Sequence, residues 1–179
     1  MKILGAIIAG GEARRFGSDK GAALFNGRAL VDHVALSLTV QTGALVIVGR
    51  GWSGIERVED RPRAGEGPLG GLSGALHHAR THGFDAVLCA GCDTLPLPSD
   101  LAIRLSPPGP AVVDGHWLMG IWPASLAEDL DNWLASQNDR SIRGFMRHVN
   151  ARIVTVDADL VNINTPEALA EAERLLGQG

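Results

Sequence analysis

The clearest sign of chemistry in the sequence is a short segment that combines paired glycines with positively charged side chains. Gly10 and Gly11 directly follow an apolar run, and Arg15 and Lys20 come a few residues later. Glycines allow backbone N–H groups to come close to phosphate oxygens, and the two cations can neutralise the charge of those oxygens. The segment therefore predicts a polyphosphate-binding loop, although an ordinary strand-to-helix turn with solvated cations has a similar composition.

The spacing in this loop differs from that of two common phosphate-binding motifs. No Gly-Lys-Ser or Gly-Lys-Thr follows the glycines at the Walker A distance, and the segment lacks the Gly-x-Gly-x-x-Gly pattern of dinucleotide-binding turns. The loop thus argues against both a P-loop ATPase and a nicotinamide-dependent dehydrogenase.

A single carboxylate, that of Asp93, follows the apolar run 86–91. Ligands of an open α/β sheet bind at the carboxyl ends of its strands, so we expect Asp93 at the same edge of the sheet as the glycine loop. One carboxylate directed at a polyphosphate suits Mg²⁺, which takes one or two protein carboxylates together with phosphate oxygens and water. Alternatively, Asp93 only caps the turn that precedes two prolines.

Two asparagines near the C-terminus form a third candidate. Asn162 and Asn164 are two residues apart, so in an extended segment both side chains point the same way, immediately before a helix that Pro166 begins. Either amide could complete a metal shell or orient an acceptor. Alternatively, the two side chains satisfy a turn and a helix cap.

Asp60 carries a weaker signal. It precedes a glycine-rich stretch, residues 65–71, that predicts a flexible loop entering a helix. Such a loop could form a backbone platform for a nucleotide or a tight connection. Asp60 could bind a ribose hydroxyl or cap a turn.

The apolar pattern shows which elements must position these residues. Four runs rich in Ile, Val, Leu and Ala are typical of parallel strands covered on both faces, at residues 3–9, 44–48, 86–91 and 153–156. Helical periodicities separate the runs, with apolar faces at Leu30, Val34 and Leu38 and at Leu69, Leu72 and Leu76. Alternating strands and helices indicate an α/β fold with a mostly parallel sheet.

Two further patterns describe the C-terminal half. The prolines between residues 106 and 123 break the alternation and indicate an inserted or antiparallel piece. Ser125 and Glu128 have the spacing of a capping box, and Thr165 with Pro166 predicts the N-cap and first residue of the last helix.

Length and composition limit the class of protein. The 179 residues predict one domain, residues 1–179, and the formal net charge of −4 argues against binding to nucleic acid or to an anionic membrane. No apolar stretch approaches the roughly 18 residues of a membrane span.

The two cysteines do not predict a metal or redox site. Cys89 and Cys92 are three residues apart on a predicted strand, so their side chains face opposite sides of the sheet. Two cysteines fit a reducing, cytoplasmic location.

Taken in order, these motifs resemble the signature of the sugar-nucleotide-type nucleotidyltransferases, in particular the molybdenum cofactor guanylyltransferases. The resemblance spans nearly the whole chain and rests on four motifs: Ile8-Ala9-Gly10-Gly11 with Arg15, Gly17, Asp19 and Lys20; Asp60 before Gly67-Pro68-Leu69-Gly70-Gly71; Cys92-Asp93-Thr94; and Asn162-Ile163-Asn164-Thr165-Pro166-Glu167. The family often has an Asn after the second strand, where this sequence has Gly49-Arg50-Gly51.

This resemblance implies a three-layer α/β/α, Rossmann-like nucleotidyltransferase fold. It further implies that GTP is bound by Ile8, Ala9, Gly10, Gly11, Lys20 and Asp60, that Asp93 binds Mg²⁺, and that Asn162 and Asn164 face the molybdopterin side.

The expected reaction is transfer of GMP from Mg-GTP to the terminal phosphate of a molybdopterin-type cofactor, with release of pyrophosphate. Arg15 and Lys20 would neutralise the triphosphate, and the acceptor phosphate, being already anionic, needs no Ser, Cys or His nucleophile. The expected partners are the two substrates and a molybdoenzyme or cofactor-insertion protein. Three alternatives stay open: a relative that uses CTP, an enzyme acting on a sugar or alcohol phosphate, and a non-catalytic nucleotide or cofactor carrier.

Overall fold

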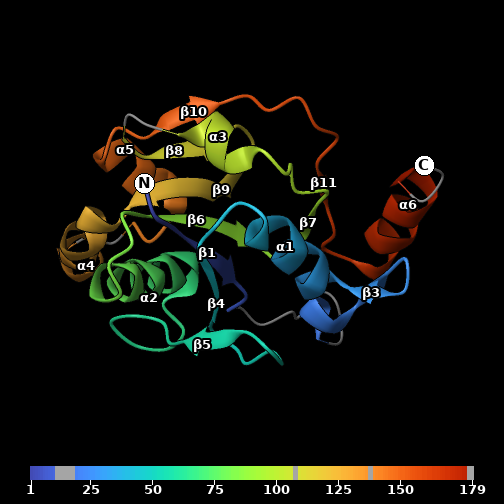
Figure 1. Cartoon of the computed structure of the whole chain (residues 1–179), viewed down its shortest axis with the longest axis horizontal. Helices are drawn as coiled ribbons and strands as arrows, with labels where there is room; N and C mark the ends of the chain where they lie inside the picture. The colour runs from blue at the N-terminus through green and yellow to red at the C-terminus, as the bar shows by residue number, and fades with distance from the viewer. Residues whose placement is uncertain (11–18, 107–108, 137–138, 177–179) are drawn as a thin grey trace.

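A seven-stranded sheet forms the centre of the structure, a computed structural model that describes residues 1–10, 19–106, 109–136 and 139–176 (Figure 1). The strand order is β10-β8-β9-β6-β1-β4-β5. In chain order its strands are β1 (Ile3–Ile8), β4 (Ala44–Val48), β5 (Glu56–Val58), β6 (Ala86–Gly91), β8 (Ala111–Val113), β9 (His116–Pro123) and β10 (Arg152–Val154). Two small antiparallel sheets pair β2 (Leu24–Phe25) with β3 (Arg28–Ala29) and β7 (Thr94–Leu95) with β11 (Val161–Asn162).

The main sheet is mostly parallel, as the sequence predicts. Only β9 runs antiparallel to its neighbours, β6 and β8, which confirms the predicted antiparallel piece between residues 106 and 123. The predicted runs 44–48 and 86–91 coincide with β4 and β6. The run 153–156 corresponds to β10, but β10 is an edge strand in which Ile153 is 56% exposed, so the expected coverage of both faces is wrong there.

Helices cover both faces of this sheet, which confirms the predicted three-layer α/β/α arrangement (Figure 1). One face packs against α1 (Leu30–Thr39) and α3 (Leu101–Leu105). The other packs against α2 (Gly67–Thr81), α4 (Ala127–Ser136) and α5 (Ile142–His148). The last helix, α6 (Pro166–Leu176), lies next to the β2–β3 hairpin, where the backbone N–H of Asn26 donates to Glu173 at 3.0 Å.

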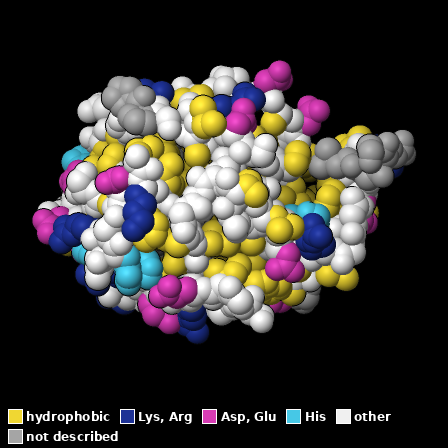
Figure 2. All heavy atoms as spheres, viewed as in Figure 1, with side chains coloured by type: hydrophobic (Ala, Val, Ile, Leu, Met, Phe, Trp, Pro, Cys, Tyr) yellow, Lys and Arg dark blue, Asp and Glu magenta, His cyan; other side chains and the backbone are white. Residues whose placement is uncertain are grey.

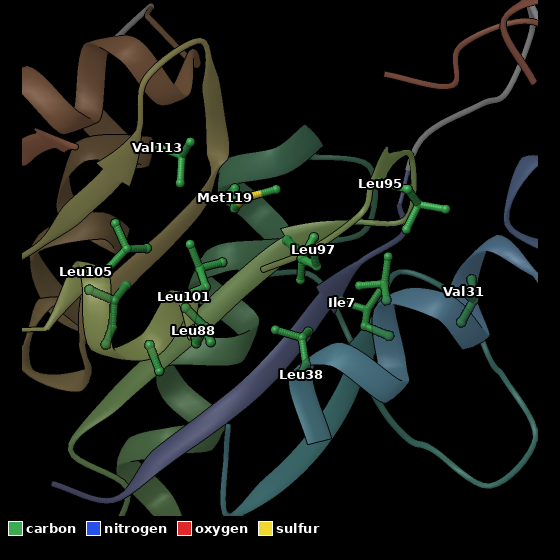
Figure 3. Packing of buried hydrophobic residues seen from close by; sticks show 14 of the residues in the cluster. Ile7, Val31, Leu38, Leu88, Leu95, Leu97, Leu101, Leu105, Val113 and Met119 are labelled. Atoms are coloured by element: carbon green, nitrogen blue, oxygen red, sulfur yellow. The ribbon is translucent and has the colours of Figure 1, made fainter. Parts of the chain in front are cut away.

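Side chains alternate between two buried clusters along each central strand. Ile7 and Leu88 point into the cluster beneath α1 and α3 (Figure 3), whereas Leu4 and Val87 point into the cluster beneath α2 and α4. This alternation follows from the pleat of a strand buried on both faces. The parallel pairing of β1 with β4 and with β6 places the carboxyl ends of these three strands at one edge of the sheet.

The glycines after residue 66 lie inside a helix and do not form the predicted flexible loop. Helix α2 begins at Gly67, and a Cβ at Gly74 would lie 2.2 Å from the backbone oxygen of Glu59. A Cβ at Gly71 would lie 2.8 Å from Cγ2 of Ile8. The glycines therefore let α2 pack directly against β1 and against the chain that leaves β5.

The two predicted helix starts have different outcomes. Ser125 lies inside a 3-10 turn, Ala124–Leu126, that continues directly into α4, so the predicted capping box is wrong. The backbone N–H of Ala124 donates to the oxygen of Asp85 at 2.9 Å, which fixes the chain next to β6 and starts the helical turn early. The hydroxyl of Thr165 accepts from the N–H of Ala168 at 3.1 Å, which confirms the predicted cap of α6.

Acidic and basic side chains are dispersed over the face shown in Figure 2 and do not gather into a basic patch there. Among the described residues, none of the helices has both the length and the apolar character needed to cross a membrane.

The close packing of α2 gives a stability prediction. Gly74→Ala raises the helix propensity, yet its new methyl group would overlap a backbone oxygen that cannot rotate away. We expect the free energy of unfolding to fall by about 1–3 kcal/mol, the usual cost of overpacking. Denaturant unfolding of Gly74→Ala, with Leu36→Ala at an exposed α1 position as the control, measures this. A Gly74→Ala variant as stable as the wild type would contradict the packing described here.

Candidate active site

Three adjacent cavities lie at the carboxyl edge of the sheet. The first, the glycine pocket, has a volume of about 250 Å³ and is lined by Ile8, Ala9, Gly10, Asp19, Lys20, Gly21, Arg50, Pro68, Gly91, Cys92, Asp93 and Leu118. The second, the asparagine pocket, also has about 250 Å³ and is lined by Gly91, Asp93, Thr94, Gly115, His116, Trp117, Leu118, Met119, Asn162 and Asn164. The third, the loop pocket, has about 500 Å³ and is lined by Gly10, Gly49, Arg57, Glu59, Asp60, Ala64, Gly65 and Gly67.

The pockets are neighbours, because they share lining residues. Gly10 separates the loop pocket from the glycine pocket. Gly91, Asp93 and Leu118 separate the glycine pocket from the asparagine pocket. The three neighbouring cavities are together called the recess, with Gly10 and Asp93 at its two internal boundaries.

Lys20 lies at the centre of this recess. Its Nζ donates to Oδ2 of Asp93 at 2.9 Å and to Oδ1 of Asn164 at 2.6 Å. The Lys20 side chain is 16% exposed and that of Asp93 34%, so the pair is partly shielded from water but open to a ligand. The ammonium group joins three segments that are far apart in the sequence.

Asp93 is positioned by the end of β6 and by the C-terminal segment. It lies two residues beyond Gly91, and its backbone oxygen accepts from the N–H of Ile163 at 2.7 Å. The hydroxyl of Thr94 donates to Oδ1 of Asn162 at 2.7 Å, alongside the pairing of β7 with β11. These bonds hold the segment 161–164 against the turn that carries the carboxylate.

Gly10 and Gly49 meet where β1 and β4 end. Gly49 has φ +87°, and a Cβ there would lie 2.5 Å from the Cα of Gly10, so only glycine fits. Beside this contact, Oδ2 of Asp60 accepts from the N–H of Gly65 at 3.1 Å. Asp60 thus caps a turn, which is one of the two roles that the sequence predicts for it. Its Oδ1 is buried and has no hydrogen-bond partner among the described residues.

The structure brings most of the predicted site residues together. Lys20, Asp93, Asn162 and Asn164 surround the boundary between the glycine and asparagine pockets. The predicted backbone segment Ile8, Ala9 and Gly10 lines the glycine pocket, and Asp60 lines the loop pocket. Gly11 and Arg15 lie outside the described residues.

The sequence analysis assigns no role to four residues of the recess, although Asp19 and Thr94 stand in the motifs that it quotes: Asp19, Arg50, Thr94 and Trp117. Arg50 had a usable signal, because it lies two residues after the run 44–48 and therefore at the carboxyl end of a strand. Trp117 lies within β9, in the proline-flanked segment whose strand direction the sequence left open.

The two cysteines lie on opposite sides of the sheet, as their spacing predicts. Cys89 belongs to the cluster beneath α2, and its thiol donates to the backbone oxygen of Leu118 at 3.0 Å. Cys92 packs against the other cluster and lines the glycine pocket. Burial raises the pKa of the Cys92 thiol to about 11, with a smaller contribution from the nearby Asp93 carboxylate, and raises that of Cys89 to about 12.

Comparison with known proteins identifies relatives of the whole chain. The model of the MobA-like NTP transferase domain matches residues 5–153. A molybdenum cofactor guanylyltransferase of Cereibacter sphaeroides is 39% identical, with 98% of each chain covered. One of Rhizobium leguminosarum bv. trifolii is 32% identical over 98% of this chain and 93% of its own length.

A solved structure has the same fold. Molybdopterin-guanine dinucleotide biosynthesis protein A from Archaeoglobus fulgidus superimposes with a TM-score of 0.77 at 20% identity, over 98% of this chain and all of that one. This likeness confirms the predicted Rossmann-like nucleotidyltransferase fold.

The raised pKa of Cys92 predicts its reactivity. At pH 8 roughly 0.1% of a thiol with a pKa of about 11 is thiolate, against roughly a quarter of an ordinary cysteine. We expect alkylation by iodoacetamide to rise about tenfold per pH unit between pH 7 and 9.5, without the plateau of a free thiol near its pKa of about 8.5. Peptide mass spectrometry separates Cys92 from the fully buried Cys89, and Cys92→Ser is the control. A plateau below pH 9 would contradict the burial of Cys92.

Proposed function

This chain belongs to the family of MobA-like NTP transferases, and we propose that it transfers GMP from Mg-GTP to the terminal phosphate of a molybdopterin-type cofactor, releasing pyrophosphate. The family membership bears out the resemblance seen in the sequence. The guanylyl specificity is supported by the shared name of the relatives, each of which is more than 30% identical over nearly the whole chain.

The observation that carries the proposal is the position of Lys20 between two pockets. Its ammonium contacts Asp93 and Asn164, the side chains that border the glycine and asparagine pockets. A donor triphosphate in the glycine pocket and an acceptor phosphate in the asparagine pocket would meet at this cation. Transfer between two phosphates needs such positioning and charge neutralisation more than it needs a nucleophilic side chain.

The nucleoside part of GTP fits the loop pocket. This cavity adjoins the glycine pocket at Gly10, and the free Oδ1 of Asp60 is a buried acceptor at its edge. A ribose hydroxyl can donate to that oxygen, which is buried and has no hydrogen-bond partner among the described residues. The backbone of Ile8, Ala9 and Gly10, continuing to Gly11, would bind the phosphates, with Arg15 as an additional cation.

The residues at the pocket boundary also fit Mg²⁺. Asp93 and Asn164 already hold a cation, the Lys20 ammonium, between two oxygen atoms, and oxygen donors are the ligands that Mg²⁺ prefers. We assign Asp93 as the protein ligand, with Asn162 or Asn164 completing the shell or orienting the acceptor. Bound there, Mg²⁺ would supply charge neutralisation on the phosphates.

The asparagine pocket suits the acceptor. Its lining includes Asn162, Asn164 and Trp117 of β9, so polar and aromatic residues border the same cavity. The molybdopterin phosphate, already anionic, is the attacking group, and no Ser, Cys or His nucleophile is assigned. The sequence Ala9-Gly10-Gly11 favours GTP over CTP, for which Ala-Ala-Gly is expected.

The proposed activity also bears on the domain organisation, the location of the protein and the recipient of its product. We propose that residues 1–179 act as one domain in the cytoplasm, where Cys89 and Cys92 remain reduced, and that a molybdoenzyme or a cofactor-insertion protein receives the product.

The role of Asp93 can be tested by a single substitution. Asp93→Asn keeps the shape of the side chain but removes the charge that balances Lys20 and binds the metal. We expect pyrophosphate release to fall by about a hundredfold or more, the usual effect of losing one preorganised electrostatic contact. Asp100→Asn, in an exposed ion pair with Arg104, is the matched control. Turnover and Mg²⁺ dependence like those of the wild type in Asp93→Asn would rule out this assignment.

Nucleotide selectivity can be tested by thermal unfolding with GTP, CTP, ATP or NAD, each with and without Mg²⁺. A ligand at ten times its dissociation constant adds about 1.4 kcal/mol, which raises Tm by roughly 3–6 °C for a chain of this length. We expect the largest shift with GTP and a smaller one when Mg²⁺ is removed. A larger shift with CTP would favour the cytidylyltransferase alternative.

A further inference from the structure

Arg50 forms an ion pair inside the glycine pocket that the proposed chemistry has not used. Its Nη1 donates to Oδ1 of Asp19 and its Nη2 donates to Oδ2 at 2.5 Å, so the guanidinium binds the carboxylate through two parallel bonds. The Arg50 side chain is 25% exposed, and its Nε is buried without a hydrogen-bond partner among the described residues. A two-point bond of this kind fixes the orientation of both groups.

The surroundings of Arg50 hold it in this orientation. Its Cζ lies 5.0 Å from the centre of the Trp52 ring, and Nε1 of Trp52 donates to Asp32 of α1 at 2.7 Å. A Cβ at Gly21 would lie 2.8 Å from Nη1 of Arg50, so glycine at that position leaves room for the guanidinium. Arg50 is therefore stacked on a ring that is itself anchored to a helix.

Asp19 connects this ion pair to Lys20. Oδ1 of Asp19 also accepts from the N–H of Gly21 at 3.1 Å and so caps the 3-10 turn Lys20–Ala22. Lys20 is the first residue of that turn, and its Nζ reaches Asp93 and Asn164. The hydrogen bond from Arg50 holds the pKa of the Asp19 carboxyl below its usual range, in keeping with a carboxylate that accepts both sets of bonds.

We propose that Arg50 is a positioning residue, which orients Asp19 and through it directs the Lys20 ammonium to the boundary of the two pockets. Arg50 is assigned this role through its two bonds to Asp19, which use one N–H of each Nη, and no phosphate contact of its own is assigned to it. This role rests on the proposed function, in which Lys20 binds the triphosphate of GTP.

A double-mutant cycle tests the coupling of Arg50 to Lys20. Isothermal titration calorimetry of Mg-GTP is carried out on the wild type, Arg50→Ala, Lys20→Ala and the double variant. We expect Arg50→Ala to weaken binding about tenfold, the effect of one charge-assisted hydrogen bond. In the Lys20→Ala background, the same substitution should change the affinity less than about twofold, because the group that Arg50 positions is already gone.

Three further variants separate positioning from other effects. Arg50→Lys keeps the charge but loses the two-point bond, so it should behave like Arg50→Ala if orientation matters and like the wild type if charge alone matters. Asp19→Ala removes the ion pair from the other side and should reproduce Arg50→Ala, which keeps the test valid should one variant not fold. Arg104→Ala, which breaks the exposed pair with Asp100, is the control and should bind Mg-GTP like the wild type.

The outcomes are distinct. Wild-type affinity in Arg50→Ala, or equal losses with and without Lys20, would overturn the positioning role while leaving the proposed function standing. An absence of Mg-GTP binding by the folded wild type would overturn the proposed function, and the role of Arg50 with it.

Discussion

The ammonium group of Lys20 is the point at which the parts of this molecule meet. It is bonded to Asp93 at the end of β6 and to Asn164 just before α6, while its own segment follows the glycine loop. Positions 20, 93 and 164 are widely separated in the chain, so this contact exists only when the sheet and the C-terminal segment are both in place. The fold therefore has to bring the Lys20 ammonium within hydrogen-bond distance of two oxygen atoms, one on Asp93 and one on Asn164.

Those constraints are of two kinds. The first is the parallel sheet, in which β1, β4 and β6 end at one edge and deliver Gly10, Gly49 and Asp93 there. The second is the short pairing of β7 with β11, which returns residues 161–164 to the same edge after the chain has passed through α4, α5 and β10. Without that return the carboxyl edge would carry a glycine loop and a carboxylate but would lack the asparagines that close one side of the recess.

Much of this was accessible from the sequence because it depends on strong local patterns. The apolar runs located the central strands, and the rule that ligands bind at the carboxyl ends of strands selected Lys20 with its loop and Asp93. Gly70 and Gly71 are predicted to lie in a loop but belong to α2, because the atoms that require glycine there, the backbone oxygen of Arg61 and the side chain of Ile8, are not visible in the local sequence pattern. Ser125 was misread as a cap because a backbone bond from Ala124 to Asp85 decides where that turn begins.

Each of the two described cations that line the glycine pocket, Lys20 and Arg50, is paired with a carboxylate. Lys20 is paired with Asp93 and Arg50 with Asp19, so these cations are neutralised before any nucleotide is present. A cation without a partner in a half-buried pocket would be costly to desolvate, and its long side chain would have to be ordered at the moment of binding. Under the proposed function, Mg-GTP would exchange one set of partners for another: the phosphates would pair with Lys20 in place of Asp93, and Asp93 would be available to hold the metal. The Arg50 pair lies outside that exchange and keeps the turn fixed while it takes place.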